Sequence, residues 1–280
     1  MTEKRSLPEN REIKRMAREL LGKKTVILKL IFAVAICWIT NIIVDIAEAS
    51  VYYTAVNFGL FDPEAGVPML ILTLIFELAA LLCVSAQAMG TVRLAFLLTQ
   101  NGDTPLTEMF FYWRGPKRYF RSLLIFLVIA APVKLFLLAI GWIMSDALPL
   151  IYLNDPELSG AIAYFFSVIG TLMASFLLGA LLLWPYSALF SAAAMFVCDD
   201  GARIADCLSG STRKTKGQLK RIFKFRFGFL PLLLLSAVSV GVLLIIYAIP
   251  YMLVSYFYYN AALFEDELFA ADMEVTFDER

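Results

Sequence analysis

The sequence predicts an all-α integral membrane protein, on the evidence of its composition, the length of its apolar segments and the distribution of its basic residues. Apolar residues make up 60% of the 280 residues and charged residues 17%, whereas soluble domains have roughly 45–50% and 25%. The mean hydropathy is +0.76. The apolar residues gather in stretches of roughly 20 that are nearly free of charge, long enough to cross a bilayer as helices. We therefore expect a polytopic bundle of about six transmembrane helices.

Six apolar stretches qualify as spans: 26–47, 69–98, 123–144, 161–183, 227–248 and 250–268. The last two form one apolar run, which is either a single overlong helix or two helices that meet at Pro250. Proline fits the first turn of a helix and pushes the preceding residue out of the helical conformation, so we divide the run there. Residues 1–268 are then a single membrane domain, followed by a flexible acidic tail at 269–280.

Basic residues predict the topology, because Lys and Arg collect on the cytoplasmic side of helix ends. The segments between spans one and two and between spans three and four contain none, whereas 114–121, 203–226 and the first 24 residues are rich in them. Both termini are therefore predicted to be cytoplasmic. In this topology Lys134 is the one basic residue far from the cytoplasmic interface.

Each cytoplasmic segment also contains a short amphipathic helix ahead of a membrane hairpin. The helices start about 95 residues apart, which suggests three tandem units. Thr104 as N-cap and Pro105 at the first helical position favour the start of the second. In each of the three helices the residues of one face repeat at helical spacing. They are Ile13, Met16, Ala17, Leu20 and Leu21 in the first; Leu106, Met109, Phe110 and Trp113 in the second; and Ile204, Cys207, Leu208 and Ser211 in the third. Such helices either lie in the interface on anionic headgroups or simply cover the ends of the bundle.

Several function classes are disfavoured by what the sequence lacks. Histidine is absent and the four cysteines show no CxxC spacing, so a histidine-dependent active site is excluded and a zinc site is not expected. Basic and acidic residues balance at 24 each, which gives no reason to expect a nucleic-acid partner. No nucleophile–base pair or phosphate-binding loop is recognisable. We expect a protein that is not an enzyme and that needs no cofactor or metal.

Ionisable residues within the spans are the first candidate site, because burying them in a bilayer is costly. They are Glu77, Lys134, Asp45 and Glu48. Glu77 and Lys134 fall at similar predicted depths, so they could pair in the bundle interior or line an outward-facing polar cavity. A fixed salt bridge that orients helices, or a Lys134 side chain that reaches outward to water, explains them equally well.

Basic residues near the cytoplasmic interface are the second candidate site. Guanidinium and ammonium groups there can contact phosphate headgroups. The residues concerned are Arg93, Arg114, Lys117 and Arg118.

Three stretches resemble one family of bacterial integral membrane proteins, domain of unknown function 975. They are REIKRMARELLG at 11–22, GTVRLAFLLTQNGDTPLTEMFFYWRGPKRYFRSLL at 90–124 and IPYMLVSYFYYNAALFEDEL at 249–268. The chain departs from the family in its long acidic tail and in having less glycine around the first span. The resemblance implies a six-helix bacterial plasma-membrane protein, related in shape to the membrane domain of some glycerophosphodiester phosphodiesterases, and no established activity.

Three functions are compatible with these features. The favoured one is a non-catalytic membrane protein that interacts with lipid or acts as a scaffold in envelope homeostasis. Its partners would be the bilayer and its anionic phospholipid headgroups, with a protein partner or homo-oligomer left open. The alternatives are a small-solute or ion transporter or channel that uses Glu77 and Lys134, and an intramembrane lipid-processing enzyme.

Overall fold

The fold is all-α across the residues that the computed structural model describes, which are 9–59, 66–153, 183, 186–190, 192–196, 198, 203–239 and 242–264. This confirms the all-α part of the predicted fold class. The elements are α1 (Asn10–Leu21), α2 (Lys24–Asn57), α3 (Gly66–Asn101), the 3₁₀-helix η1 (Leu106–Arg114), α4 (Pro116–Leu153), α6 (Ala193–Phe196), α7 (Ile204–Lys216), α8 (Leu219–Phe227), α9 (Leu230–Val238), the π-helix η2 (Leu244–Ala248) and α10 (Ile249–Phe264).

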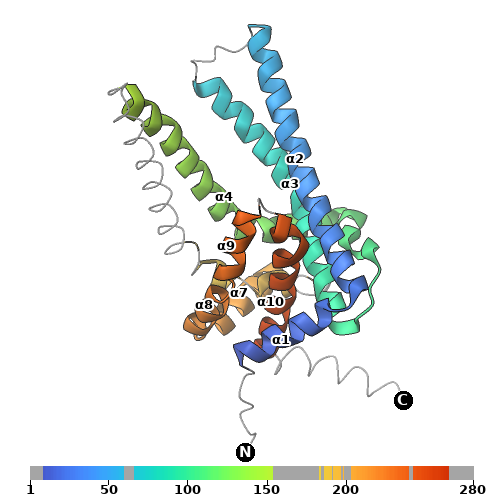
Figure 1. The fold of residues 1–280 in the computed structure, drawn as a ribbon. Helices are drawn as coiled ribbons and strands as arrows, with labels where there is room; N and C mark the ends of the chain where they lie inside the picture. Colours follow the sequence, from blue (N-terminus) through green and yellow to red (C-terminus); the bar gives the residue numbers. More distant parts are fainter. Residues whose placement is uncertain are drawn as a thin grey trace, which may run out of the picture.

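Two long arms project from a body of shorter helices (Figure 1). One arm is the antiparallel hairpin of α2 and α3, and the other contains α4, which diverges from that hairpin. Within the described residues, two helical stretches are long and apolar enough to cross a membrane, Lys24–Asn57 and Ile71–Asn101. Many of their large apolar side chains face outward, including Leu28, Phe32, Ile39, Ile43 and Ile46 on α2 and Ile71, Leu74, Ile75 and Leu78 on α3.

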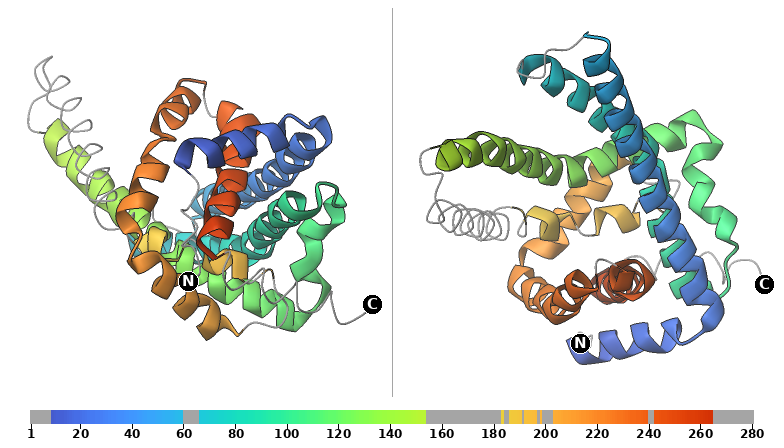
Figure 2. Two further views of the ribbon diagram at one scale, coloured as in Figure 1. Left: turned by 90° about the horizontal axis from the view of Figure 1, so that it is seen from below. Right: turned by 45° about the horizontal axis from the view of Figure 1, so that its top comes forward.

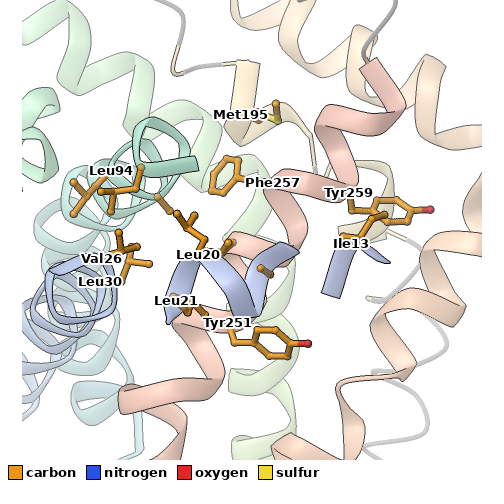
Figure 3. Packing of buried hydrophobic residues seen from close by; sticks show 14 of the residues in the cluster. Ile13, Leu20, Leu21, Val26, Leu30, Leu94, Met195, Tyr251, Phe257 and Tyr259 are labelled. Carbon is orange, nitrogen blue, oxygen red and sulfur yellow. The ribbon is translucent and has the colours of Figure 1, made fainter. Parts of the chain in front are cut away.

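Helix α1 crosses the base of the molecule and packs against α10 (Figure 2). The single extended residue Lys23 separates α1 from α2 and turns the chain between them. The predicted amphipathic face of α1 is confirmed, since Ile13 and Ala17 are fully buried. Figure 3 shows Ile13 and Leu20 of α1 among aromatic side chains of α10. This face therefore covers the end of the bundle, which is the simpler of the two predicted roles.

The second amphipathic segment is a 3₁₀-helix, and its buried face differs from the prediction. Met109 and Tyr112 are buried, whereas Phe110 and Trp113 are exposed. A 3₁₀-helix repeats every three residues, so Met109 and Tyr112 share a face, whereas the prediction assumed the 3.6-residue period of an α-helix. The predicted N-cap is also wrong, because Pro105 holds that position and no side chain caps the helix.

The third amphipathic segment is α7, and its polar residues prove more important than its apolar ones. Cys207 is buried as predicted, and Ser211 and Thr215 are buried beside it. The Ser211 hydroxyl donates to the backbone carbonyl of Leu189 at 2.6 Å. The Thr215 hydroxyl lies 3.1 Å from the same carbonyl and 2.7 Å from the carbonyl of Ser211, and it donates to these two oxygens. These hydrogen bonds fix α7 against the segment that precedes α6.

The predicted boundary between the last two spans is wrong. Helix α9 ends at Val238, and η2 runs without a break into α10 through Pro250. Proline removes one helical N–H. The helix accommodates it with a π-turn immediately before Pro250, in which the N–H of Ile249 bonds to the carbonyl of Leu244 five residues earlier. The Ser239 hydroxyl accepts the N–H of Leu243 at 3.1 Å where this helical run begins.

Two of the predicted segments lie outside the described residues. They are almost all of span 161–183 and the acidic tail 269–280.

Candidate functional site

A groove of about 350 Å³ lies between α2, α3 and the η2–α10 helix. Eight apolar and three polar residues line it, which is the usual character of a small-molecule site. They are Val34, Cys37, Trp38 and Asn41 of α2; Ala88, Thr91 and Val92 of α3; and Leu244, Ile245, Ile249 and Leu253 of η2 and α10.

The polar side chains of the groove bond mainly within the two helices. The Thr91 hydroxyl donates to the carbonyl of Gln87 at 2.9 Å, and the Asn41 amide donates to the carbonyl of Cys37 at 3.0 Å. The Cys37 sulfur lies 3.4 Å from the Thr91 hydroxyl and joins the two helices. A site whose polar groups are satisfied by the protein suits an apolar ligand.

Local sequence explains why a groove forms here. Ala88 and Thr91 are small, so this face of α3 leaves space beside α2. The third wall is the η2–α10 helix, whose π-turn was traced above to Pro250. Single π-turns inside helices frequently occur at functional sites.

Sequence reasoning missed this groove, although a signal was present. Cys37 and Asn41 are one helical turn apart in a span that is mainly apolar. Polar residues at such spacing mark one face of a helix. The third wall could not have been found, because the prediction divided the chain at Pro250.

A second cluster holds α3, η1 and α4 together around Arg93. Its guanidinium donates to Glu108 of η1 at 3.2 Å and to the backbone carbonyl of Cys198. It also lies 3.7 Å from the centre of the Phe111 ring, with Arg118 at 4.2 Å from the same ring. The Arg93 and Glu108 side chains are only 15% and 18% exposed. The hydrogen bonds and the ring contact of the Arg93 side chain are therefore made within the protein.

The other predicted headgroup residues lie at the edge of this cluster. Arg114 donates to Glu108 at 3.3 Å but remains 46% exposed, and Lys117 is exposed at the start of α4. The large exposed side chains of Trp113 and Phe120 lie in the same stretch of chain. Headgroup contact at Arg114, Lys117 and Arg118 stays a prediction.

One acidic residue of α2 contacts α3 toward the far end of the hairpin. The Thr73 hydroxyl of α3 donates to the Glu48 carboxylate of α2 at 2.8 Å. Glu77 is half-buried one turn along from Thr73, and Asp45 is exposed one turn along from Glu48. The structure thus brings Glu48 close to α3 through a neutral hydroxyl.

Lys134 is placed on α4, and its side chain lies outside the description. The Tyr119 hydroxyl of α4 donates to the carbonyl of Leu82 of α3 at 2.8 Å, where the two helices meet. From that point Glu77 is about 7 Å along α3 and Lys134 is about 22 Å along α4. The two helices diverge beyond it (Figure 1), and the pairing of Glu77 with Lys134 stays a prediction. Helix α4 also continues unbroken through Pro132.

Cations on aromatic rings form a third cluster, which the sequence did not reveal. The Lys14 ammonium of α1 lies 4.1 Å from the centre of the Phe229 ring and 5.5 Å from that of Phe225. Burial, and then the nearby charge of Arg18, lowers the pKa of Lys14. The Phe225 ring stacks on Tyr259 of α10 at 4.5 Å. This cluster joins the N-terminal helix to α8 and α10.

Among the described residues, no group of three or more Cys, Asp or Glu side chains could hold a metal ion. No protein-family model, curated protein or solved structure matches the chain.

Proposed function

We propose that the protein is a non-catalytic, multi-pass protein of the bacterial plasma membrane that binds membrane lipid. The observation that carries the proposal is the continuous exposure of large apolar side chains along α2 and α3. Water would penalise such a surface by roughly 25 cal/mol per Å², whereas a bilayer solvates it. The resemblance of the sequence to domain of unknown function 975 supports the same assignment.

An exposed ion pair supports a position for the cytoplasmic boundary. Lys29 of α2 and Asp103 after α3 lie 2.6 Å apart, and the Asp103 side chain is 89% exposed. The Lys29 ammonium lowers the pKa of this carboxyl. A charge so exposed belongs in water or among headgroups, so we place the interface at this pair.

This boundary bears on the transport hypothesis. Asp45 and Glu48 lie about 24 and 28 Å along α2 from Lys29, close to the far side of a hydrocarbon core about 30 Å thick. Acidic groups at that depth reach the outer headgroups. Asp45 and Glu48 therefore give no support to a transporter, and we favour lipid binding.

The six helices would then form three hairpins with both termini cytoplasmic. The first hairpin is α2 and α3, and the second is α4 with residues 161–183. The third differs, since the nine residues of α9 extend only about 14 Å. We propose that α9 and the η2–α10 helix enter the membrane from the cytoplasmic side without crossing it.

Topology is tested by single cysteines at positions 57, 154 and 241 in a cysteine-free background. In intact cells a membrane-impermeant maleimide should label positions 57 and 154 but leave position 241 unlabelled. Labelling at position 241 would contradict this proposal and show that α9 and the η2–α10 helix each cross the membrane, which gives six crossings in total. Failure at both 57 and 154, with labelling only after lysis, would contradict the proposed hairpins.

Lipid binding is tested by the thermal stability of the full chain in detergent. A ligand that binds only the folded state raises the Tm, and we expect phosphatidylglycerol to raise it more than phosphatidylcholine does. Lys117→Gln with Arg118→Gln should reduce this difference. The matched control is Lys216→Gln with Lys220→Gln, which removes two exposed or half-buried charges from the other basic segment. Equal responses to the two lipids in the unmodified protein would refute anionic headgroup binding.

A further inference from the structure

We propose that the groove between α2, α3 and the η2–α10 helix binds one hydrocarbon chain of a phospholipid from the cytoplasmic leaflet. This inference rests on the proposed membrane function and adds a defined site to it. The argument uses the volume of the groove, its depth and the chemistry of its walls.

The volume suits a single chain. An apolar protein cavity of about 150 Å³ binds benzene, so a groove of about 350 Å³ has room for roughly twice that number of carbons. A packed helix is about 10–12 Å across and would need far more space. The groove is therefore too small for a transmembrane helix of a partner or of a second copy.

The depth places the groove in the cytoplasmic leaflet. Measured along α2 from Lys29, its lining begins at Val34, about 7 Å away, and ends at Asn41, about 18 Å away. Half of a hydrocarbon core is about 15 Å. At this depth the acyl chains of lipids surround the protein and water is scarce.

The walls favour hydrocarbon over a polar ligand. Thr91 and Asn41 direct hydrogen bonds to carbonyls of their own helices. No charged residue lines the groove. Leu244, Ile245 and Leu253 form the third wall, which is apolar. An acyl chain would therefore contact apolar side chains along the length of the groove.

The test is photo-crosslinking of the full-length protein in phosphatidylcholine vesicles that contain a phosphatidylcholine with a diazirine in one acyl chain. Labelled peptides are quantified by mass spectrometry. The matched reference is the stretch 42–46 of α2, which lies about 20–26 Å along the helix from Lys29 and so within the hydrocarbon core. It carries the exposed side chains of Ile43 and Ile46 but lines no groove. We expect residues 34–41 and 244–253 to be labelled at least threefold more than 42–46.

Two variants fill the groove from different walls, Ala88→Phe from α3 and Ile245→Trp from η2. Each should lower groove labelling to the level of residues 42–46 while leaving the labelling of 42–46 unchanged, which also reports that the hairpin is intact. Equal labelling of both regions in the unmodified protein, or no response to either variant, would overturn the acyl-chain site. Absence of label at 42–46 would instead contradict the membrane function itself.

Discussion

Gly90 is the position where the packing of α3 against η1 can be tested most directly. A Cβ atom added there would lie 1.7 Å from the carbonyl oxygen of Met109 and 2.6 Å from its carbonyl carbon. Real Cβ contacts are almost never below 3.0 Å, so the backbone of η1 would have to move by more than an ångström. A backbone atom cannot rotate away as a side chain does.

The expected loss of stability follows from the contacts that this movement of η1 would disturb. Met109 is fully buried, and its neighbour Glu108 holds the ion pair with Arg93. Overpacking typically costs about 1–3 kcal/mol, and we expect Gly90→Ala to reach the upper end, about 3 kcal/mol. This exceeds the gain of up to about 1 kcal/mol that alanine normally brings to a helix. For a chain of this size the Tm should fall by about 6–10 °C.

The assay is thermal unfolding of the detergent-purified protein, followed by size-exclusion chromatography after heating. Gly217→Ala is the matched control, because an added Cβ there meets nothing within 4 Å and its φ of −77° suits alanine. The control should melt at or slightly above the wild-type temperature. A Gly90→Ala protein that melts with the wild type would refute the close approach of α3 and η1.

Three further predictions concern polar contacts of the cytoplasmic body. Arg93→Met should destabilise the protein by about 2 kcal/mol by leaving Glu108 without its most buried partner, and adding Glu108→Gln should recover part of this loss in a double-mutant cycle. Because burial lowers the pKa of Lys14, the unfolded chain binds more protons than the folded protein between the lowered pKa and the ordinary value of 10.5, so stability should rise with pH as 10.5 is approached from below. Lys14→Met should reduce that rise in Tm, and an identical slope in the variant would contradict it. Ser211→Ala or Thr215→Val should each cost about 1 kcal/mol. Because the Thr215 hydroxyl lies closer to the carbonyl of Ser211 than to that of Leu189, the two losses should add in the double variant. A double variant that loses more unfolding free energy than the sum would contradict this and show that both hydroxyls serve the Leu189 carbonyl.

The sequence was sufficient where a single helical period governs the structure. The apolar face of α1 could be read from the spacing of Ile13 and Ala17, because an isolated amphipathic helix buries one face whatever covers it. It failed in η1, where the period is three, and at Pro250, where a π-turn absorbs the proline. Both failures have one cause, since local hydrogen bonding changed the helix type and hydrophobic spacing does not report that change.

The candidate sites were harder to predict than the fold because their partners are distant in the chain. Arg93 contacts Cys198, which is 105 residues away. The groove joins α2 to a helix about 200 residues later. Individual residues such as Glu77 or Lys134 stand out in a sequence by their charge, whereas Ala88 and Ile245 become important only through the space they leave.

Helix α10 links the features that the sequence showed separately. Leu253 faces the groove, whereas Val254 and Phe257 belong to the core that also contains Ile13 of α1. The Phe257 ring lies 5.8 Å from Phe96 of α3. The aromatic residues that crowd this helix therefore fill the contacts with α1, α3 and α8. Because the same rigid helix forms the third wall of the groove, the position of the N-terminal amphipathic helix and the width of the groove depend on one element.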